Sequence, residues 1–412
     1  MTMAEGDLAV TELRFVRGAT IAARPPPAAM TGALGWLRTN LLSSPFNIAL
    51  TILIALLLAW VIPGLVKFLL IDAVWTGSDR DACREVVQHR EIGACWPFVW
   101  ERWSYFVYGS YPIPQRWRVD VFFTMLAIGV VWLLWLEAPR RDLGSVYFFV
   151  VLPITSFILL TGWSAIGLPP VDTALWGGIL VTIVVASVGI VCSLPIGIML
   201  ALGRRSRMPA VRLFSVIFIE FVRGVPLVTV LFMASVMLPL FVPEEYSPDK
   251  LVRALIGIAL FASAYMAEVV RAGLQAIPKG QFEGAMAVGL GYWQMMRLII
   301  LPQALKITIP NIVNTYIGLF KDTTLVFIVG IFDFLRTIEV ARIDPKWAAP
   351  VTSTTGYAVA AIFYLIFCYA MARYARAMEA RLARGDKRQR MIPKSGNRFS
   401  DKIMRNQKEV LP

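Results

Sequence analysis

The chain has 412 residues, of which 58% are hydrophobic and only 16% are charged. Apolar runs of about 20 residues recur along it, which is the length that spans roughly 30 Å of hydrocarbon and which a soluble fold of this size does not need. The formal net charge is +13, but the basic residues form short clusters between apolar runs and at the two ends. This pattern argues against nucleic-acid binding and is typical of loops on the cytoplasmic side of a membrane.

The first 45 residues are polar and basic, and they contain the run Pro25-Pro26-Pro27. This segment is too long and too interrupted by proline for a cleaved signal peptide. We therefore expect residues 1–45 to form a cytoplasmic tail.

Eight apolar runs follow, which predicts an all-α polytopic membrane protein with about eight transmembrane helices. Their approximate bounds are 46–70, 119–137, 146–164, 176–202, 213–241, 251–275, 305–329 and 357–379. With the amino terminus inside, most of the basic clusters, including the one from Arg204 to Arg212, fall on the cytoplasmic side, and the acidic pair Glu244-Glu245 falls outside. The excess of basic residues inside predicts that both termini are cytoplasmic.

Composition divides the chain into parts. Residues 46–170 are expected to form an amino-terminal extension with three spans and a large outer loop at about 71–118, residues 171–380 a second domain with five closely spaced spans, and residues 381–412 a basic cytoplasmic tail. The outer loop is rich in tryptophan, which indicates either an aromatic belt at the membrane interface or a docking surface for another protein. These tryptophans include Trp75, Trp96, Trp100, Trp103 and Trp117.

The chain contains four cysteines and one histidine, and these residues limit the disulfide and metal chemistry open to it. Cys83 and Cys95 share the outer loop, where they either form a disulfide, if the loop is extracytoplasmic, or remain two separate small residues. The single histidine, His89, lies in the same loop. No metal-ligand spacing occurs, so we expect neither a metal nor a cofactor.

A motif of fixed spacing lies between the sixth and seventh spans. It consists of Glu283, Gly284, Ala285, Gly289, Ile299, Leu301 and Pro302. Small residues on a short helix let another protein approach closely, Glu283 offers a charge for docking, and Gly289 is expected to end the helix. The spacing resembles the EAA signature of ABC importer permeases, E-A-A-x3-G-x9-I-x-L-P, with Gly284 in place of an alanine. The alternative is an amphipathic loop at the membrane interface.

Other stretches resemble one branch of that superfamily, the polar amino acid permeases of the histidine, glutamine and general L-amino acid systems. They are residues 218–227, 265–273, 280–283 and 321–325. The resemblance covers about 200 residues and implies that the last five spans form a type I ABC importer transmembrane domain. The extended amino-terminal half looks most like the membrane subunits of the general L-amino acid permease group.

Charged residues within spans are costly, so by default they indicate a functional site. Glu220 and Arg223 stand three residues apart on one helical face, directly before Gly224 and Pro226, which should loosen the helix. We expect them to pair beside this break, where they could hold the ammonium and carboxylate groups of a zwitterion.

Two further charged groups lie in the sixth and seventh spans. Glu268 and Arg271 repeat the spacing of three, and they either reach the interface or pair with each other, or they contact substrate directly. By resemblance, the substrate pathway contains Glu220 and Arg223 together with Lys321, Asp322, Thr323 and Thr324. The alternative is that these residues form ion pairs between helices or subunits that only shape the fold.

No G-x-x-x-x-G-K-[ST] sequence occurs, so the energy for transport must come from another subunit. The resemblance implies four partners: a cytoplasmic ATPase dimer, a second permease subunit, a periplasmic amino acid binding protein and an amino acid substrate. Because of the long extra half, the second permease is expected to be a shorter sister chain, which gives a heterodimer. The setting implied is the bacterial inner membrane.

The predicted function is import of L-amino acids by alternating access, with no covalent chemistry on the substrate. An ion-coupled secondary amino acid transporter is the first alternative, but it has no need of the EAA loop and should show paired inverted repeats. A membrane-embedded enzyme is the second, but no catalytic constellation occurs in the spans.

Overall fold

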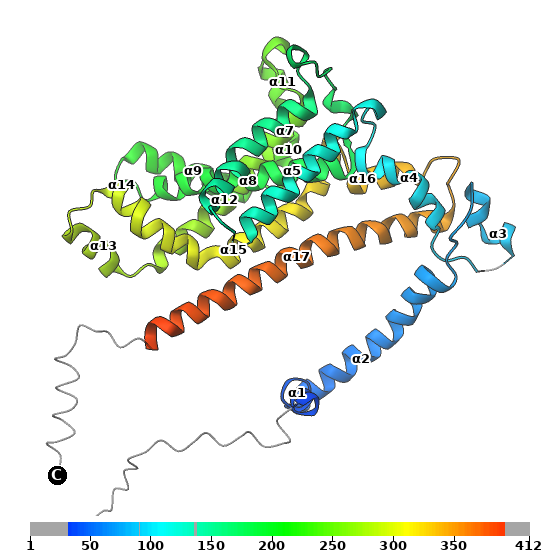
Figure 1. Cartoon of the computed structure of the whole chain (residues 1–412), viewed down its shortest axis with the longest axis horizontal. Helices are drawn as coiled ribbons and strands as arrows, with labels where there is room; N and C mark the ends of the chain where they lie inside the picture. The colour runs from blue at the N-terminus through cyan, green and yellow to red at the C-terminus, as the bar shows by residue number, and fades with distance from the viewer. Residues whose placement is uncertain (1–31, 90, 136–137, 392–412) are drawn as a thin grey trace, which may run out of the picture. The chain divides into compact units, whose positions relative to one another are not determined.

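Helices make up most of the described chain (Figure 1). The computed structural model describes residues 32–89, 91–135 and 138–391. Most of the predicted amino-terminal tail and much of the predicted carboxy-terminal tail lie outside these residues. Contacts between residues group the chain into two compact units that divide after Ile71.

Among the described residues, seven helical stretches are long and apolar enough to cross a membrane, and a bent pair of helices brings the number to eight if the pair is one span. The seven are Pro45–Ile71, Ile113–Leu134, Asp142–Thr161, Gly178–Arg204, Lys250–Ala276, Tyr292–Val329 and Pro350–Leu382. Each overlaps one of the predicted runs. The predicted all-α membrane fold is therefore confirmed.

The first span belongs to the first unit. α1 (Gly32–Asn40) precedes α2 (Pro45–Val66), which continues as a π-helical turn (Lys67–Ile71). The Ser44 hydroxyl caps α2 by accepting the Asn47 N–H. No described residue of α2 is buried within the chain. A helix that is apolar and exposed on every side needs lipid or another protein around it.

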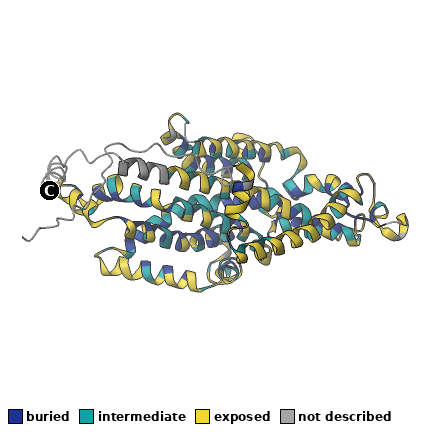
Figure 2. Cartoon of the chain, turned by 90° about the horizontal axis from the view of Figure 1, so that it is seen from below, coloured by how far each residue is buried: buried dark blue, intermediate teal, exposed yellow. Residues whose placement is uncertain are grey.

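Four long helices form the centre of the second unit. They are α8 (Gly178–Arg204), α12 (Lys250–Ala276), α15 (Leu301–Asp322) and α17 (Pro350–Met391). α12 packs against both α8 and α15, and α15 also packs against α17. Glycine allows α8 to approach α12 closely, because a Cβ at Gly197 would lie 2.8 Å from the Met266 Cβ. Buried residues follow the inner faces of the helices, and exposed residues cover their outer faces (Figure 2).

The second and third spans share a core with these helices. α5 (Trp117–Leu134) and α7 (Leu152–Thr161) contribute buried apolar residues to one cluster with α8 and α12. The other half of α8 and α12 forms a second cluster with α15 and the segment before it. Only the first span lies in the other unit, and the domain boundary predicted near residue 170 stays a prediction.

Short helices complete the second unit. They are α3 (Glu85–Gln88), α4 (Trp96–Tyr108), α6 (Arg141–Val146), α9 (Pro209–Gly224), α10 (Leu227–Phe232), α11 (Leu238–Phe241), α13 (Lys279–Ala287), α14 (Tyr292–Met295) and α16 (Phe334–Ala341). One two-residue strand, β1 (Phe332–Asp333), is present among the described residues.

The fifth predicted span, 213–241, is not one continuous helix. α9 ends at Gly224, and the stretch Leu227–Phe241 leaves it at an angle of 108°. Pro226 has no N–H to donate and favours extended backbone at Val225 (φ −107°, ψ 133°), which stops α9. The sequence indicated a loosened helix at this point, and the structure corrects the single span to a bent pair.

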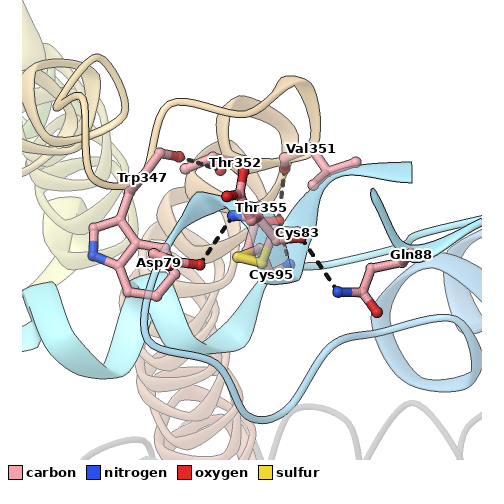
Figure 3. Close-up of a disulfide and its surroundings, with 9 residues drawn as sticks. Asp79, Cys83, Gln88, Cys95, Trp347, Val351, Thr352 and Thr355 are labelled. Atoms are coloured by element: carbon pink, nitrogen blue, oxygen red, sulfur yellow. Dashed lines mark hydrogen bonds between the residues drawn. A yellow bond between two sulfur atoms is a disulfide. The ribbon is translucent and has the colours of Figure 1, made fainter. Parts of the chain in front are cut away.

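A segment that we call the platform, residues 72–111, follows the first span in the sequence. Cys83 and Cys95 are joined there by a disulfide, with Cα atoms 5.8 Å apart (Figure 3). The sequence left the state of this pair open. The Cys95 N–H also donates to the Thr355 hydroxyl of α17, at 2.9 Å, and Trp347 is fully buried against the platform.

Ion pairs fasten the platform to the segment before α17. The pairs are Glu101–Lys346 and Arg102–Asp344. The Lys346 ammonium lies 2.6 Å from the Glu101 carboxylate, and this contact holds the pKa of Glu101 below its usual value. The platform is thus held against the rest of the second unit by polar and apolar contacts.

We expect the disulfide to stabilise the platform locally. Its cysteines are separated by 12 positions, and closing a loop of that size contributes about 2–3 kcal/mol in the chain-entropy model. In a protein with both Cys83→Ser and Cys95→Ser, amide hydrogens of the platform should exchange faster, while those of α12 should not change. Hydrogen–deuterium exchange of the purified protein measures both regions, and equal protection of the platform would contradict the expectation.

A short cap holds the start of α8 against α16. β1 forms parallel bridges to Gly177 and Gly178. Gly178 has a φ of +67°, and a Cβ there would lie 2.1 Å from the Phe106 carbonyl oxygen, so only glycine fits. The Phe334 N–H donates to the Thr182 hydroxyl of α8, at 2.9 Å. The cap therefore depends on close backbone contact.

Asp333 should make stability depend on pH. It is fully buried at the N-cap of α16, where it accepts the N–H groups of Leu335 and Arg336. Burial raises the pKa of its carboxyl group to about 7, although these hydrogen bonds oppose the shift. Between about pH 4 and pH 7 the folded chain holds a proton that the unfolded chain has lost. Stability therefore falls as the pH rises through this window, by on the order of 4 kcal/mol.

We expect Asp333→Asn to remove most of this dependence, because asparagine keeps the cap without the charge. Melting temperatures of the purified protein at about pH 5 and about pH 8 test this expectation. The variant should gain more stability relative to the unsubstituted protein at the higher pH than at the lower pH. Parallel pH profiles for the two proteins would show that Asp333 titrates normally.

Candidate functional site

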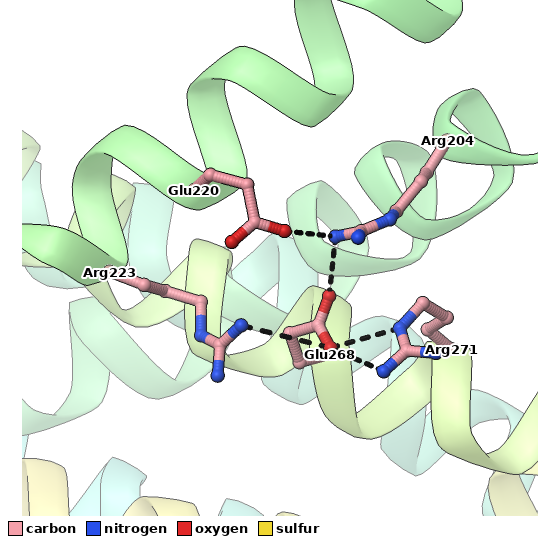
Figure 4. Close-up of polar contacts among 5 residues, drawn as sticks. All are labelled: Arg204, Glu220, Arg223, Glu268 and Arg271. Atoms are coloured by element: carbon pink, nitrogen blue, oxygen red, sulfur yellow. Dashed lines mark hydrogen bonds and ion pairs between the residues drawn. The ribbon is translucent and has the colours of Figure 1, made fainter.

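Five charged side chains meet where α8, α9 and α12 come together, and we call them the ion-pair cluster (Figure 4). Glu268 of α12 is its centre. Its carboxylate lies 2.8 Å from Arg204 and 2.7 Å from Arg271. Arg223 is 3.7 Å away, and Arg204 also binds Glu220, at 2.9 Å. Three arginines against two glutamates give the cluster a formal excess of one positive charge.

The predicted pairing of Glu220 with Arg223 is wrong. Glu220 contacts Arg204 of α8, whereas Arg223 contacts Glu268 of α12. The Arg223 guanidinium also lies 5.7 Å from the centre of the Tyr265 ring. α9 packs against both α8 and α12, so its long side chains find partners on other helices that the spacing within one helix does not reveal.

Glu268 and Arg271 do pair with each other, through two hydrogen bonds of 2.9 and 2.7 Å. This is one of the alternatives that the sequence left open. Sequence reasoning placed Arg204 in a basic loop and so missed its part in the cluster. The available signal was the length of its apolar run, since α8 has 27 residues and about 20 suffice to cross a bilayer.

A polar face runs along α15 beside this cluster. It consists of Asn311, Asn314, Thr315, Gly318 and Asp322. Their spacings of three and four residues place them on one side of the helix. Part of the face lines a shallow, open depression with Glu268, and part lines a cavity of about 300 Å³ with Tyr265. Thr315 lines both the depression and the cavity, so they adjoin.

Only Asp322, of the four residues predicted at the end of the seventh span, lines the depression or the cavity. Lys321 is exposed and belongs to neither lining. The Thr323 and Thr324 hydroxyls donate to carbonyl oxygens three residues earlier, and Thr323 is fully buried. α15 ends here and continues as a 3₁₀ helix (Thr323–Val329). The two threonines therefore contribute to the local backbone structure.

Sequence reasoning also missed the rest of the polar face. The two asparagines and Thr315 stand in an otherwise apolar run, separated by helical spacings, and this pattern was the signal that could have found them. Tyr265 begins one of the resembling stretches, residues 265–273, but the sequence alone assigned it no role. Its position between the Arg223 guanidinium and the cavity lined by Asp322 becomes visible only when α9, α12 and α15 are packed together.

The predicted coupling motif begins on α13. Glu283 and Gly284 are exposed, and a Cβ at Gly284 would meet nothing within 4 Å. Ala285 is only 2% exposed and packs into the core. The helix ends before Gly289, as the sequence predicted, because Gly289 has a φ of +79° and the Leu290 N–H donates back to the Ala285 carbonyl.

The second half of the motif anchors the next helix. Ile299 and Leu301 are half-buried in the cluster that also holds Ala285, and Pro302 lies in the first turn of α15. Large apolar side chains remain exposed around α13. They are Met286 at 58%, Val288 at 73% and Trp293 at 72%. Such a group on α13, the turn after it and α14 is typical of a surface that another protein covers.

Comparisons with known proteins identify the family. A family profile described as the inner membrane component of binding-protein-dependent transport systems matches residues 193–384. The chain is 48% identical over 362 residues to the inner membrane amino-acid ABC transporter permease protein YhdY of Escherichia coli strain K12. The matched region covers 88% of this chain and 96% of that protein. The chain is 38% identical over 437 residues to the glutamate/glutamine/aspartate/asparagine transport system permease protein BztC of Rhodobacter capsulatus, with 91% and 99% covered.

One solved structure, of an amino acid ABC transporter with histidines, is 25% identical, covers 50% of this chain and 92% of its own, and has a TM-score of 0.43. The family profile and the two permeases show that the chain belongs to the inner membrane components of binding-protein-dependent transport systems, the permease subunits of ABC importers. The family resemblance, the membrane fold and the transport function predicted from the motifs are confirmed. The ion-coupled alternative gains no support.

Proposed function

We propose that this chain carries amino acids into the cytoplasm along the polar face of α15 and the facing side of α12. The polar surface around Thr315 supports this proposal, because Thr315 lines an open depression together with Glu268 and a cavity together with Asp322. Intramembrane charges are costly and are retained where they serve a pathway. The substrate would pass along this route while the transporter alternates between outward-facing and inward-facing states.

The surroundings of Tyr265 would give the route charges of both signs. It lines the cavity that contains Asp322, and the Arg223 guanidinium lies over its ring. A zwitterion at this position would meet a carboxylate for its ammonium group and a guanidinium for its carboxylate group. Glu220 would act through Arg204, and Lys321, Thr323 and Thr324 would shape the end of α15.

Polar amino acids with acidic or amide side chains are the proposed substrates. The relative named for glutamate, glutamine, aspartate and asparagine matches 91% of this chain and is covered almost completely by it. The single excess positive charge of the ion-pair cluster would also attract an anionic side chain.

The partners follow from the exposed surfaces. α13, with Glu283 and the exposed apolar residues around it, would dock into a cytoplasmic ATPase subunit. That subunit would hydrolyse the ATP, since no G-x-x-x-x-G-K-[ST] sequence occurs in this chain. A shorter sister permease would complete a heterodimer, and the platform would face a periplasmic binding protein. The excess of basic residues in the inner loops supports cytoplasmic termini.

We expect Thr315→Val and Asp322→Asn each to lower amino acid uptake about tenfold, because the first removes a hydroxyl group from the route and the second removes a negative charge. The matched control is Thr308→Val, since Thr308 is also on α15 but is buried, lines neither the depression nor the cavity, and hydrogen-bonds to its own helix. We compare the unsubstituted permease and the three variants in proteoliposomes that also contain the ATPase, the sister permease and the binding protein. The measurement is uptake of labelled glutamate, glutamine, lysine and leucine. Equal uptake by Thr315→Val and Thr308→Val would exclude this route.

A further inference from the structure

We propose that a cationic cavity at the ends of α8, α9 and α12 binds the phosphate headgroup of an anionic phospholipid. The cavity has a volume of about 510 Å³. Its lining residues are Arg204, Arg205, Arg212, Val216, Arg271 and Gln275. Four of the six lining side chains carry a guanidinium group, and no carboxylate belongs to the lining.

Two of these arginines remain available to an anion. Arg204 and Arg271 already bind the carboxylates of the ion-pair cluster. Within the described part of the chain, Arg205 and Arg212 form no ion pair. Arg205 donates to the Leu274 carbonyl, at 3.3 Å, through only one of its five N–H groups. A guanidinium with free N–H groups binds a phosphate group through paired hydrogen bonds.

The surface next to the cavity favours a lipid over a free anion. α9 exposes three large apolar side chains beside Arg212, which are Leu213 at 61%, Phe214 at 65% and Ile217 at 57%. A phosphate ion would gain nothing from this apolar surface, whereas an acyl chain would lie against it. Basic pockets between transmembrane helices at the cytoplasmic side are suited to anionic headgroups, and the basic cluster from Arg204 to Arg212 is predicted on that side.

Occupancy of this cavity would connect two parts of the machinery. Arg204 and Arg271 belong to the ion-pair cluster, while the Arg205 guanidinium lies 5.5 Å from the Phe282 ring of α13. A phosphate between Arg205 and Arg271 would bind one arginine of the cluster and one arginine that packs on α13, the helix on which the coupling motif begins. The site goes beyond the proposed transport route, because it makes activity depend on membrane composition rather than on the substrate.

The direct test is binding of phosphatidylglycerol to the purified importer complex, measured by native mass spectrometry during a lipid titration. The test variant carries Arg205→Gln and Arg212→Gln, and the matched control is Arg207→Gln, an exposed arginine of the same basic cluster outside the lining. Each arginine near the headgroup contributes about fivefold in affinity, so the double variant should bind roughly 25-fold more weakly. The control should bind like the unsubstituted complex.

A second arm identifies the source of the phosphate. The titration is repeated with phosphatidylcholine and with added inorganic phosphate at about 10 mM. Preference for phosphatidylglycerol that inorganic phosphate does not abolish supports the lipid site. Equal weakening by Arg207→Gln overturns the proposal in favour of general surface charge, and complete displacement by inorganic phosphate overturns it in favour of a free anion. Because binding is measured without transport, failure of this test leaves the transport route to its own experiment.

Discussion

Glu268→Ala should reduce amino acid uptake by roughly 30-fold and lower the melting temperature of the purified permease. The Glu268 side chain is only 16% exposed and binds three arginines from three helices. Its removal leaves three partly enclosed positive charges facing one another. Breaking a buried ion pair costs about 3–5 kcal/mol, but the arginines are 27–36% exposed, so solvent screening reduces our expectation to about 2 kcal/mol.

Glu339→Ala is the matched control for this experiment. Glu339 pairs with Arg336 at 3.0 Å, three residues away on α16, with the same spacing as Glu268 and Arg271. The Arg336 side chain is 44% exposed and the pair has no third charged partner among the described residues, so its loss should cost less than about 1 kcal/mol. Thermal unfolding and proteoliposome uptake are compared for the two variants. Similar losses of stability and uptake in both variants would show that binding three arginines gives Glu268 no more importance than a single ion pair.

Sequence reasoning succeeded where the determining interactions are local. Seven of the eight apolar runs coincide with membrane-spanning helices, because the number of residues needed to cross a bilayer depends on the segment itself. The end of α13 at Gly289 was also predictable, since a left-handed backbone conformation selects glycine. The bend at Pro226 was visible as a loosened helix, but its angle of 108° depends on what packs on either side.

The candidate site was less predictable because its contacts join different helices. The partners of Glu220 and Arg223 lie about 16 and 45 positions away in the sequence, and only the packing of α9 against its neighbours brings them close. The disulfide shows the same limit. Two cysteines in one loop form a bond only if their Cα atoms come within about 7 Å, and contacts of the platform with Trp347 and Thr355 help to set that distance.

Glu283→Lys should reduce ATP-dependent uptake to less than about a tenth while leaving the permease folded. Glu283 is exposed on α13 and forms no ion pair within the described residues, so reversing its charge removes no contact inside this chain. Surface substitutions of this kind change stability by about 0.5 kcal/mol or less. α13 itself stays anchored through Ala285, which is 2% exposed, and through the Arg205 guanidinium over Phe282. Any large effect must therefore arise at a partner surface.

Gly284→Ala is the control next to it, and it also restores the alanine of the signature. A methyl group at this position meets nothing within 4 Å, and alanine favours a helix over glycine by about 1 kcal/mol. Uptake and ATPase stimulation by the binding protein should stay within about twofold of the unsubstituted importer, the change that 0.5 kcal/mol produces. If Glu283→Lys left uptake intact, α13 would not be the coupling element. If Gly284→Ala also abolished uptake, close approach of the partner backbone at Gly284, rather than the charge of Glu283, would be the basis of coupling.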